Sequence, residues 1–338
     1  MKKWILAILL TSLLASLLIG CSDKSDDSGV QKDQNIKPPA ETQSVDNGTD
    51  ADTNAGANTN TNSNANTTVE TKMPGQQPEG EQHLADIDKL STLFGFTNSD
   101  GSQIIVTGQN AGLDTSMPDY GKIIGEGGKT YSVKFVKWQK GSEQSNGRDT
   151  ANNFAHLEGY IFDVINGKAA GNETYYVVNE QDFDLKSLIK ISSPEQTMTD
   201  KELETEETLK DNISLMKDRG VTDMWSLADI GSDQKLYLVK FENKDKDRLF
   251  SIVLFTGDDF LFQDYPAIAE DDYSVWRVDD GGEVSPDMFP LLFAAETRQG
   301  LLLGLSWWGS EGLNTFFLAE NEGNLKELEI SYGRYTAP

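Results

Sequence analysis

Short apolar runs alternate with polar turns over most of the chain after residue 83, and this pattern predicts β-strands. The runs are rich in β-branched and aromatic side chains, which pack well on a pleated sheet. Two of them, 235–242 and 248–255, are separated only by Asn-Lys-Asp-Lys-Asp, which predicts an antiparallel hairpin. After Asp287, four further runs separated by glycine-bearing turns predict an antiparallel meander. The remaining predicted strands lie at 130–138, 159–165 and 174–178.

Two other stretches repeat their apolar residues with the helical period of 3.6. Residues 84–94 predict a short helix, because leucine, isoleucine and phenylalanine would fall on one face. Residues 199–219 predict a longer helix, because Thr199 and Glu202 have the spacing of a capping box and acidic residues crowd the first turns. The predicted buried stripe of this longer helix is Leu209, Ile213 and Met216.

The predicted fold class is therefore α+β, predominantly antiparallel β with a few helices. Residues 124–135 and 230–241 align without a gap, and seven of the twelve aligned positions are identical. One interpretation is a duplication that gives two related α+β modules, 84–198 and 199–338. The other interpretation is coincidence, because short strands reuse valine, lysine, phenylalanine and tyrosine freely.

The first twenty residues have the layout of a secretory signal peptide. Lys2 and Lys3 form a basic start, residues 4–19 are apolar apart from one threonine and two serines, and Gly20 precedes Cys21. A membrane-spanning helix needs about 20 apolar residues, and this run is shorter. Its ending, Leu-Ile-Gly-Cys, resembles the lipobox of bacterial lipoprotein precursors.

This resemblance implies that Cys21 receives a diacylglyceryl thioether and that a dedicated peptidase cuts between Gly20 and Cys21. Two acyl chains give stable membrane attachment, whereas a single chain gives only marginal binding. We therefore expect a protein held by lipid on the extracytoplasmic face of the cell membrane. Cys21 is the only cysteine, so no disulfide, thiolate metal site or cysteine nucleophile is expected elsewhere in the chain.

Residues 21–83 follow the predicted signal peptide and have a low-complexity composition. Asparagine, threonine, glycine, proline and acidic residues dominate, and large apolar side chains are scarce. Such a composition cannot bury enough apolar surface to offset the entropy of ordering, so it predicts a disordered linker. We expect this linker to act as a tether between the lipid anchor and the folded region.

The charge and the histidine content argue against several classes of function. The chain has 29 basic and 55 acidic residues, a formal net charge of −26, which argues against nucleic acid as a partner. His83 and His156 are the only histidines, so the chain alone cannot supply a zinc site built on several histidines. No complete catalytic, phosphate-binding or cofactor-binding motif is present, and we expect no cofactor. Gly125-Glu-Gly-Gly-Lys-Thr130 is predicted to be a turn and not a phosphate loop.

Acidic residues concentrate between 258 and 287 and raise the question of calcium, which takes six to eight oxygen ligands. The spacing of an EF-hand loop is absent, so solvated loop acids explain the cluster more simply and no metal site is predicted. The cluster consists of Asp258, Asp259, Asp264, Glu270, Asp271, Asp272, Asp279, Asp280, Glu283 and Asp287.

Trp307 and Trp308 are the remaining candidates for a ligand site. Adjacent residues on a strand point to opposite faces, so the pair indicates either a strand buried on both sides or an exposed sugar-stacking platform. The first interpretation is favoured. The most consistent function is a binding or interaction protein of the cell envelope, whose partner is the cell wall or an envelope protein. The alternatives are a carboxylate-based cell-wall glycan hydrolase and a solute-binding lipoprotein of a transporter.

Overall fold

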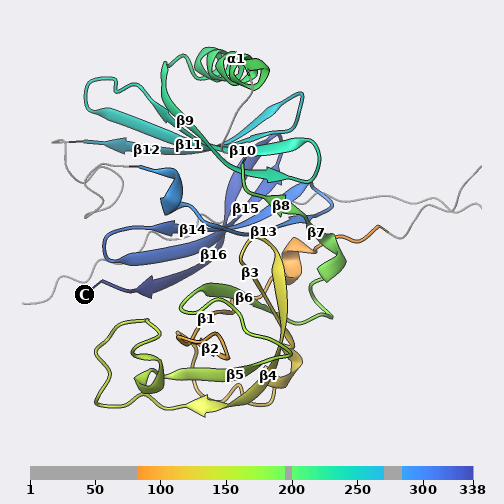
Figure 1. Ribbon diagram of the computed structural model, residues 1–338, viewed down its shortest axis with the longest axis vertical. Helices are drawn as coiled ribbons and strands as arrows, with labels where there is room; N and C mark the ends of the chain where they lie inside the picture. The colour runs from red at the N-terminus through yellow and green to blue at the C-terminus, as the bar shows by residue number, and fades with distance from the viewer. Residues whose placement is uncertain (1–81, 195–199, 270–283, 338) are drawn as a thin grey trace, which may run out of the picture. The chain divides into compact units, whose positions relative to one another are not determined.

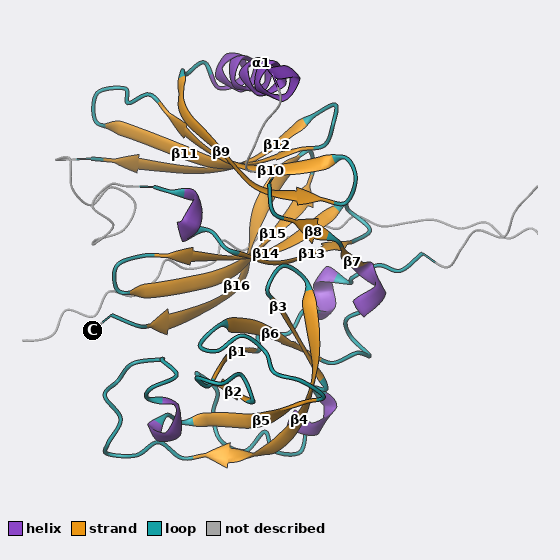
Figure 2. Cartoon of the chain, in the orientation of Figure 1, coloured by secondary structure: helices purple, strands orange, loops and turns teal. Residues whose placement is uncertain are grey.

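Antiparallel strands dominate the computed structural model, which describes residues 82–194, 200–269 and 284–337 (Figures 1 and 2). The predicted fold class, predominantly antiparallel β with few helices, is confirmed, because the named strands pair antiparallel and form one closed barrel and two five-stranded sheets. Gly20, Cys21 and residues 22–81 of the predicted linker lie outside the described residues. His83, the last residue of the predicted linker, is described, and its Nδ1 lies 2.7 Å from Asp184 Oδ2.

The first of these units is a six-stranded barrel. In spatial order its strands are β1 (Phe94–Thr97), β2 (Gln103–Val106), β5 (Gly159–Ile165), β4 (Lys129–Gln139), β3 (Lys122–Gly125) and β6 (Thr174–Val178). Its interior holds apolar side chains from β2, β3, β4, β5 and β6, among them Ile104, Phe162 and Val177.

The second unit is an open sheet that we call the outer sheet. Helix α1 (Asp200–Lys217) covers one of its faces, where Leu209 and Ile213 pack on Tyr237, Val239 and Val253. In spatial order the strands of the outer sheet are β12 (Phe260–Ile268), β11 (Asp247–Phe255), β10 (Gln234–Phe241), β9 (Val221–Ile230) and β8 (Ile191–Ser192).

The third unit, the central sheet, packs against the outer sheet on one face and against the barrel on the other. Leu303 and Leu305 meet the outer sheet, whereas Leu302 and Phe317 join a cluster with barrel residues such as Tyr176. Figure 1 shows the resulting order of helix α1, outer sheet, central sheet and barrel. The strands are β16 (Asn324–Tyr335), β15 (Gly312–Asn321), β14 (Leu301–Trp308), β13 (Leu291–Glu296) and β7 (Leu188–Ile189).

Burial on both faces explains the nearly continuous apolar sequence of β14. Its odd-numbered residues face the outer sheet, and its even-numbered residues face the barrel side. Gly304 makes room for the ring of Phe293, because a Cβ at this position would lie 2.8 Å from a ring carbon of Phe293. The second of the four runs predicted after Asp287 is therefore a strand, β14, and it is buried on both faces.

The two predicted helices have different outcomes. The longer one is confirmed as α1, but its predicted stripe is wrong at Met216, which is 58% exposed. Thr199, of the predicted capping box, lies outside the described residues.

The helix predicted at 84–94 is wrong, because only a single 3₁₀ turn, η1 (Ile87–Lys89), forms there. The chain then extends into β1, and the Ser91 N–H donates a hydrogen bond to the Tyr176 hydroxyl at 2.8 Å. Pairing with the barrel outweighs the local helical pattern, because it buries Phe94 completely.

The two similar segments at 124–135 and 230–241 both form a β-hairpin. The first spans the β3–β4 turn and the second spans the β9–β10 turn. The sheets that contain the hairpins differ, since one is a closed barrel and the other an open sheet. The chain leaves the barrel at Val178, and both β7 and β8 already belong to the two open sheets. The sequence likeness is therefore accompanied by the same local structure but not by the same sheet topology.

Ile213 gives a direct test of how helix α1 is held. Its side chain is completely buried, so Ile213→Val should lower the free energy of unfolding by about 1 kcal/mol. Leu215, two residues later, is 80% exposed, and Leu215→Val removes the same amount of carbon with a change of less than about 0.5 kcal/mol. Urea denaturation of both variants measures the difference. Equal effects would contradict the packing of α1 described above.

Candidate functional site

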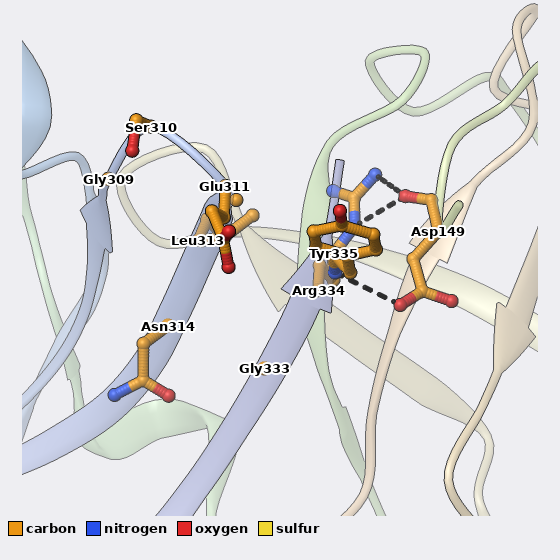
Figure 3. Close-up of a pocket in the computed structure, with 10 residues that line it drawn as sticks. Asp149, Gly309, Ser310, Glu311, Leu313, Asn314, Gly333, Arg334 and Tyr335 are labelled. Carbon is orange, nitrogen blue, oxygen red and sulfur yellow. Dashed lines mark hydrogen bonds between the residues drawn. The ribbon is translucent and has the colours of Figure 1, made fainter. Parts of the chain in front are cut away.

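A surface cavity of about 450 Å³ lies beside the last strand, and we call it the C-terminal pocket. Three parts of the chain form it: the turn between β14 and β15, the end of β16, and the loop between β4 and β5 (Figure 3). Its lining residues are Asp149, Gly309, Ser310, Glu311, Gly312, Leu313, Asn314, Gly333, Arg334 and Tyr335.

The alternation of β16 decides which side chains reach this pocket. Tyr332 and Arg334 face the barrel: the Tyr332 hydroxyl lies 2.8 Å from the Thr107 hydroxyl, and the Arg334 guanidinium lies 4.1 Å from the centre of the Phe96 ring. Gly333 and Tyr335 are exposed and face the opposite side. The pocket is therefore built over a strand whose other face is buried against the barrel.

Arg334 is 2% exposed, and all five of its N–H groups are used. Nε and Nη2 donate to the Asp149 carbonyl oxygen at 3.2 and 2.9 Å, as Figure 3 shows. Nη1 donates to the Asn172 carbonyl oxygen at 3.0 Å and to the Thr174 hydroxyl at 2.9 Å. Nη2 also donates to Asn172 Oδ1 at 3.0 Å. Arg334 therefore ties the C-terminal strand to two separate loops of the barrel.

Burial lowers the pKa of Arg334, and the negative charges of Asp149 and Glu173 oppose that shift. Arginine keeps its proton under such conditions because its ordinary pKa is far above neutral pH. A buried cation is costly unless its donors are satisfied, and here carbonyl, amide and hydroxyl oxygens satisfy them. The arrangement holds the strand in place and leaves no guanidinium N–H for a ligand.

Asp149 extends the free edge of β16. Its N–H donates to the Tyr335 carbonyl oxygen at 2.7 Å, and its Oδ2 accepts from the Tyr335 N–H at 3.1 Å. Burial raises the pKa of Asp149, although the Tyr335 N–H and the charge of Arg334 oppose the shift. Tyr335 itself is 40% exposed, and the Arg148 guanidinium lies 4.2 Å from the centre of its ring.

A second group of polar residues, the Glu126 cluster, sits in the β3–β4 turn at one end of the barrel. Glu126 Oε1 accepts hydrogen bonds from the Tyr131 hydroxyl at 2.9 Å, from the Ala170 N–H at 3.0 Å and from the Tyr175 hydroxyl. Its Oε2 lies 2.9 Å from Lys129 Nζ. Burial opposes ionisation, but these hydrogen bonds outweigh it and lower the pKa of Glu126 to about 2. Burial together with this carboxylate raises the pKa values of Tyr131 and Tyr175.

The backbone of the same turn joins the barrel to the central sheet. The N–H groups of Gly127 and Gly128 donate to the carbonyl oxygens of Leu291 and Leu292 at 3.2 and 2.7 Å. Glu126, Gly127 and Gly128 all have a left-handed φ, which is why two glycines occur together here. The Gly-Glu-Gly-Gly-Lys-Thr segment is a hairpin turn, as the sequence predicts, and its N–H groups are occupied by protein.

The structure places the two predicted tryptophans on opposite sides of β14. Trp307 is 8% exposed and packs between the two sheets, with its ring centre 5.3 Å from Phe250 and Phe289 and 5.4 Å from Tyr265. Trp308 is half-buried on the other side. Trp307 therefore belongs to the core between the sheets and offers no open ring face to a ligand.

The acidic residues between 258 and 287 are described only in part, because Glu270 to Glu283 lie outside the described residues. Asp264 forms an ion pair with Lys217 at 2.7 Å and accepts a hydrogen bond from the Ser251 hydroxyl at 2.6 Å. Across the described ranges, no group of three or more histidine, cysteine, aspartate or glutamate residues could hold a metal ion. His156 Nδ1 lies 2.9 Å from the Ser142 hydroxyl.

Sequence reasoning alone did not find Asp149, Arg334, Gly333 or Glu126. An arginine and a glycine near the chain end carry no motif, and their partners lie more than a hundred residues away. Gly333 directly follows the last predicted strand, which ends at Tyr332, so the sequence did not mark it as a residue inside a strand.

Comparison with known proteins does not add a family to these observations. No protein-family model, no curated protein and no solved structure matches the chain. In the part of the chain that the structure describes, no helix combines the length and the apolar character needed to cross a bilayer. The function must therefore be inferred from the chain's own residues.

Proposed function

We propose that the protein is a lipoprotein, anchored through Cys21 on the extracytoplasmic face of the cell membrane, whose folded region binds a ligand or partner of the envelope. The observation that carries this proposal is the order of a basic start, an apolar run over residues 4–19, and the ending Leu-Ile-Gly-Cys at Cys21. A thiol is the side chain that can take a thioether-linked lipid.

The distance between Cys21 and the folded region fits this role. About 60 residues, 22–81, separate Cys21 from the start of the described region at residue 82, and a fully extended chain of that length reaches about 200 Å. The folded region could therefore act well away from the membrane surface. The net charge of −26 also favours a position away from an anionic leaflet.

The C-terminal pocket supports binding more than catalysis. Arg334 and Asp149 are both committed to holding β16, through the guanidinium and through the hydrogen bonds with Tyr335. Side chains used in this way shape and stiffen a pocket but are poorly placed to donate or accept protons in a reaction. What remains for a ligand is a formed cavity with an aromatic ring at its rim.

Growth of the producing cells with an alkyne-tagged fatty acid tests the anchor. We expect label on the wild-type protein and none on Cys21→Ala, which should also keep residues 1–20 because its cleavage site is lost. Ser22→Ala is the matched control and should be labelled and cleaved like the wild type. Label on Cys21→Ala, or a wild-type protein without label, would contradict the proposal.

A further inference from the structure

We infer that the C-terminal pocket binds a neutral, hydroxyl-rich ligand, a short oligosaccharide segment; this deepens the binding function proposed above and rests on it. The starting observation is Gly333, which lies inside β16 directly across from Asn314. Its φ is not left-handed, and a Cβ placed on it would meet no atom within 4 Å. Neither the backbone nor the packing of the protein therefore requires glycine at this position.

Glycine in this position has a cost that a ligand would explain. Inside a strand, glycine is less stable than alanine because it loses more backbone entropy on folding, and it often marks a place where a ligand approaches the backbone closely. Gly333, Gly309 and Gly312 all line the C-terminal pocket, so three of its ten lining residues lack a side chain. The resulting cavity of about 450 Å³ lies within the usual size of small-ligand sites, about 300–1,000 Å³.

The polar groups that remain for a ligand are mainly acceptors. The N–H groups of Arg334 are all used within the protein. Within the described residues, the Glu311 carboxylate forms no hydrogen bond or ion pair, and it lines the pocket together with the Asn314 amide. Carboxylate and amide oxygens accept hydrogen bonds from hydroxyl groups. A phosphate or sulfate would find repulsion from Glu311 and no guanidinium donor from Arg334.

The local charges balance. Asp149, Glu311 and Arg334 line the pocket, and Arg148 stacks on the pocket residue Tyr335, so two residues of each formal charge occur at this site. A cationic ligand therefore gains little net attraction, and an anionic ligand is disfavoured by the net charge of the whole chain. This balance favours a neutral ligand.

Tyr335 supplies the apolar part of the site. Its ring lines the pocket and is 40% exposed, and Arg148 stiffens it by stacking at 4.2 Å. An aromatic ring offers a flat apolar face with a polar tip, which suits the C–H face of a sugar ring. The pocket thus combines hydrogen-bond acceptors, an exposed aromatic ring and a strand segment without a side chain at Gly333. These three features together suit a short, neutral oligosaccharide.

Calorimetric titration of the full-length protein, kept in a polyoxyethylene detergent that contains no sugar, tests this inference. The probes are chitotriose and maltotriose, which are neutral, the fully deacetylated glucosamine trimer, which is cationic, and inorganic phosphate. We expect binding of a neutral trisaccharide only. Gly333→Val should weaken that binding at least tenfold, because its side chain enters the pocket, and should leave the thermal midpoint unchanged or higher, because valine favours strands.

Gly121→Val is the matched control. Gly121 also lacks a left-handed φ and does not line the pocket. A Cβ added to Gly121 would have a Glu180 carboxylate oxygen as its nearest neighbour, at 3.9 Å. This variant should bind like the wild type. Glu311→Gln leaves the backbone unchanged and should weaken binding severalfold. It is the pocket variant to measure if Gly333→Val fails to fold.

Three results would overturn the inference: no binding of either neutral trisaccharide, binding only of the cationic trimer or phosphate, or unchanged affinity in a folded pocket variant. The fatty-acid label is measured on the same preparations. Labelled protein that binds no neutral sugar contradicts the pocket assignment alone, whereas unlabelled protein that binds it contradicts the anchor alone.

Discussion

Replacing Arg334 with alanine should lower the free energy of unfolding by about 3 kcal/mol, because several buried acceptors lose their donors at once. The carbonyl oxygens of Asp149 and Asn172 and the Thr174 hydroxyl all bond to this guanidinium. Its removal also leaves a gap beside the Phe96 ring. Urea denaturation followed by circular dichroism measures the change.

Two further variants show whether the planar fork matters or only the charge. Arg334→Lys should recover less than half of the loss, since an ammonium has three donors at one point and cannot reach both loops. Lys326→Ala, at an exposed position of the same strand, should change stability by less than about 0.5 kcal/mol. A drop of less than about 1 kcal/mol for Arg334→Ala would show that the hydrogen bonds from Arg334 to Asp149, Asn172 and Thr174 do not hold β16 in place.

Glu126→Gln should destabilise the protein by about 2 kcal/mol at neutral pH, because hydrogen bonds to a charged group are stronger than those to a neutral amide. Glu126 Oε1 serves three donors, and an amide oxygen would serve them more weakly. Tyr131→Phe is a milder comparison, as it removes one of these donors and should cost about 1 kcal/mol.

The Glu126 cluster also predicts how stability depends on pH. The pKa of Glu126 is about 2 in the folded protein and 4.5 ordinarily, so the folded state favours the ionised form. Its contribution is fully present above about pH 4.5 and is lost as the pH falls through 4.5 toward 2. Between pH 6 and pH 3 the wild type should therefore lose more stability than Glu126→Gln. Parallel curves for the two proteins would contradict this assignment.

Strands were predictable where their own side chains have a clear preference for β-structure. Strands β5 and β6 have the predicted bounds. β10 differs from the prediction by one residue at each end, and β11 by one residue at its start. These strands are short runs of β-branched and aromatic residues, and their burial on at least one face keeps that pattern intact.

Other strands depend on their neighbours and were missed. β9 carries several polar residues, yet it lies between β8 and β10 and pairs with both. β12 contains Asp264 and Pro266, which a strand tolerates at the edge of a sheet, where β12 lies. β1 follows a segment with helical periodicity, and its pairing with β2 and β6 makes it a strand.

The candidate site could not be predicted for a related reason. Arg334 meets Asp149 across 185 positions and Asn172 across 162, and no local pattern encodes such pairs. For the two tryptophans, the sequence predicted the local structure but not the surroundings. Trp307 and Trp308 were correctly expected on a strand, but only the packing of two sheets shows that Trp307 is enclosed. Sequence thus indicated the fold class, and tertiary contacts determined the pocket.

The membrane anchor at Cys21 is the central claim, and the intact mass of the wild-type protein extracted from native membranes tests it most directly. We expect a chain that begins at Cys21 and carries the added mass of a diacylglyceryl group. A chain that begins elsewhere, or one whose Cys21 thiol is free, would contradict the claim.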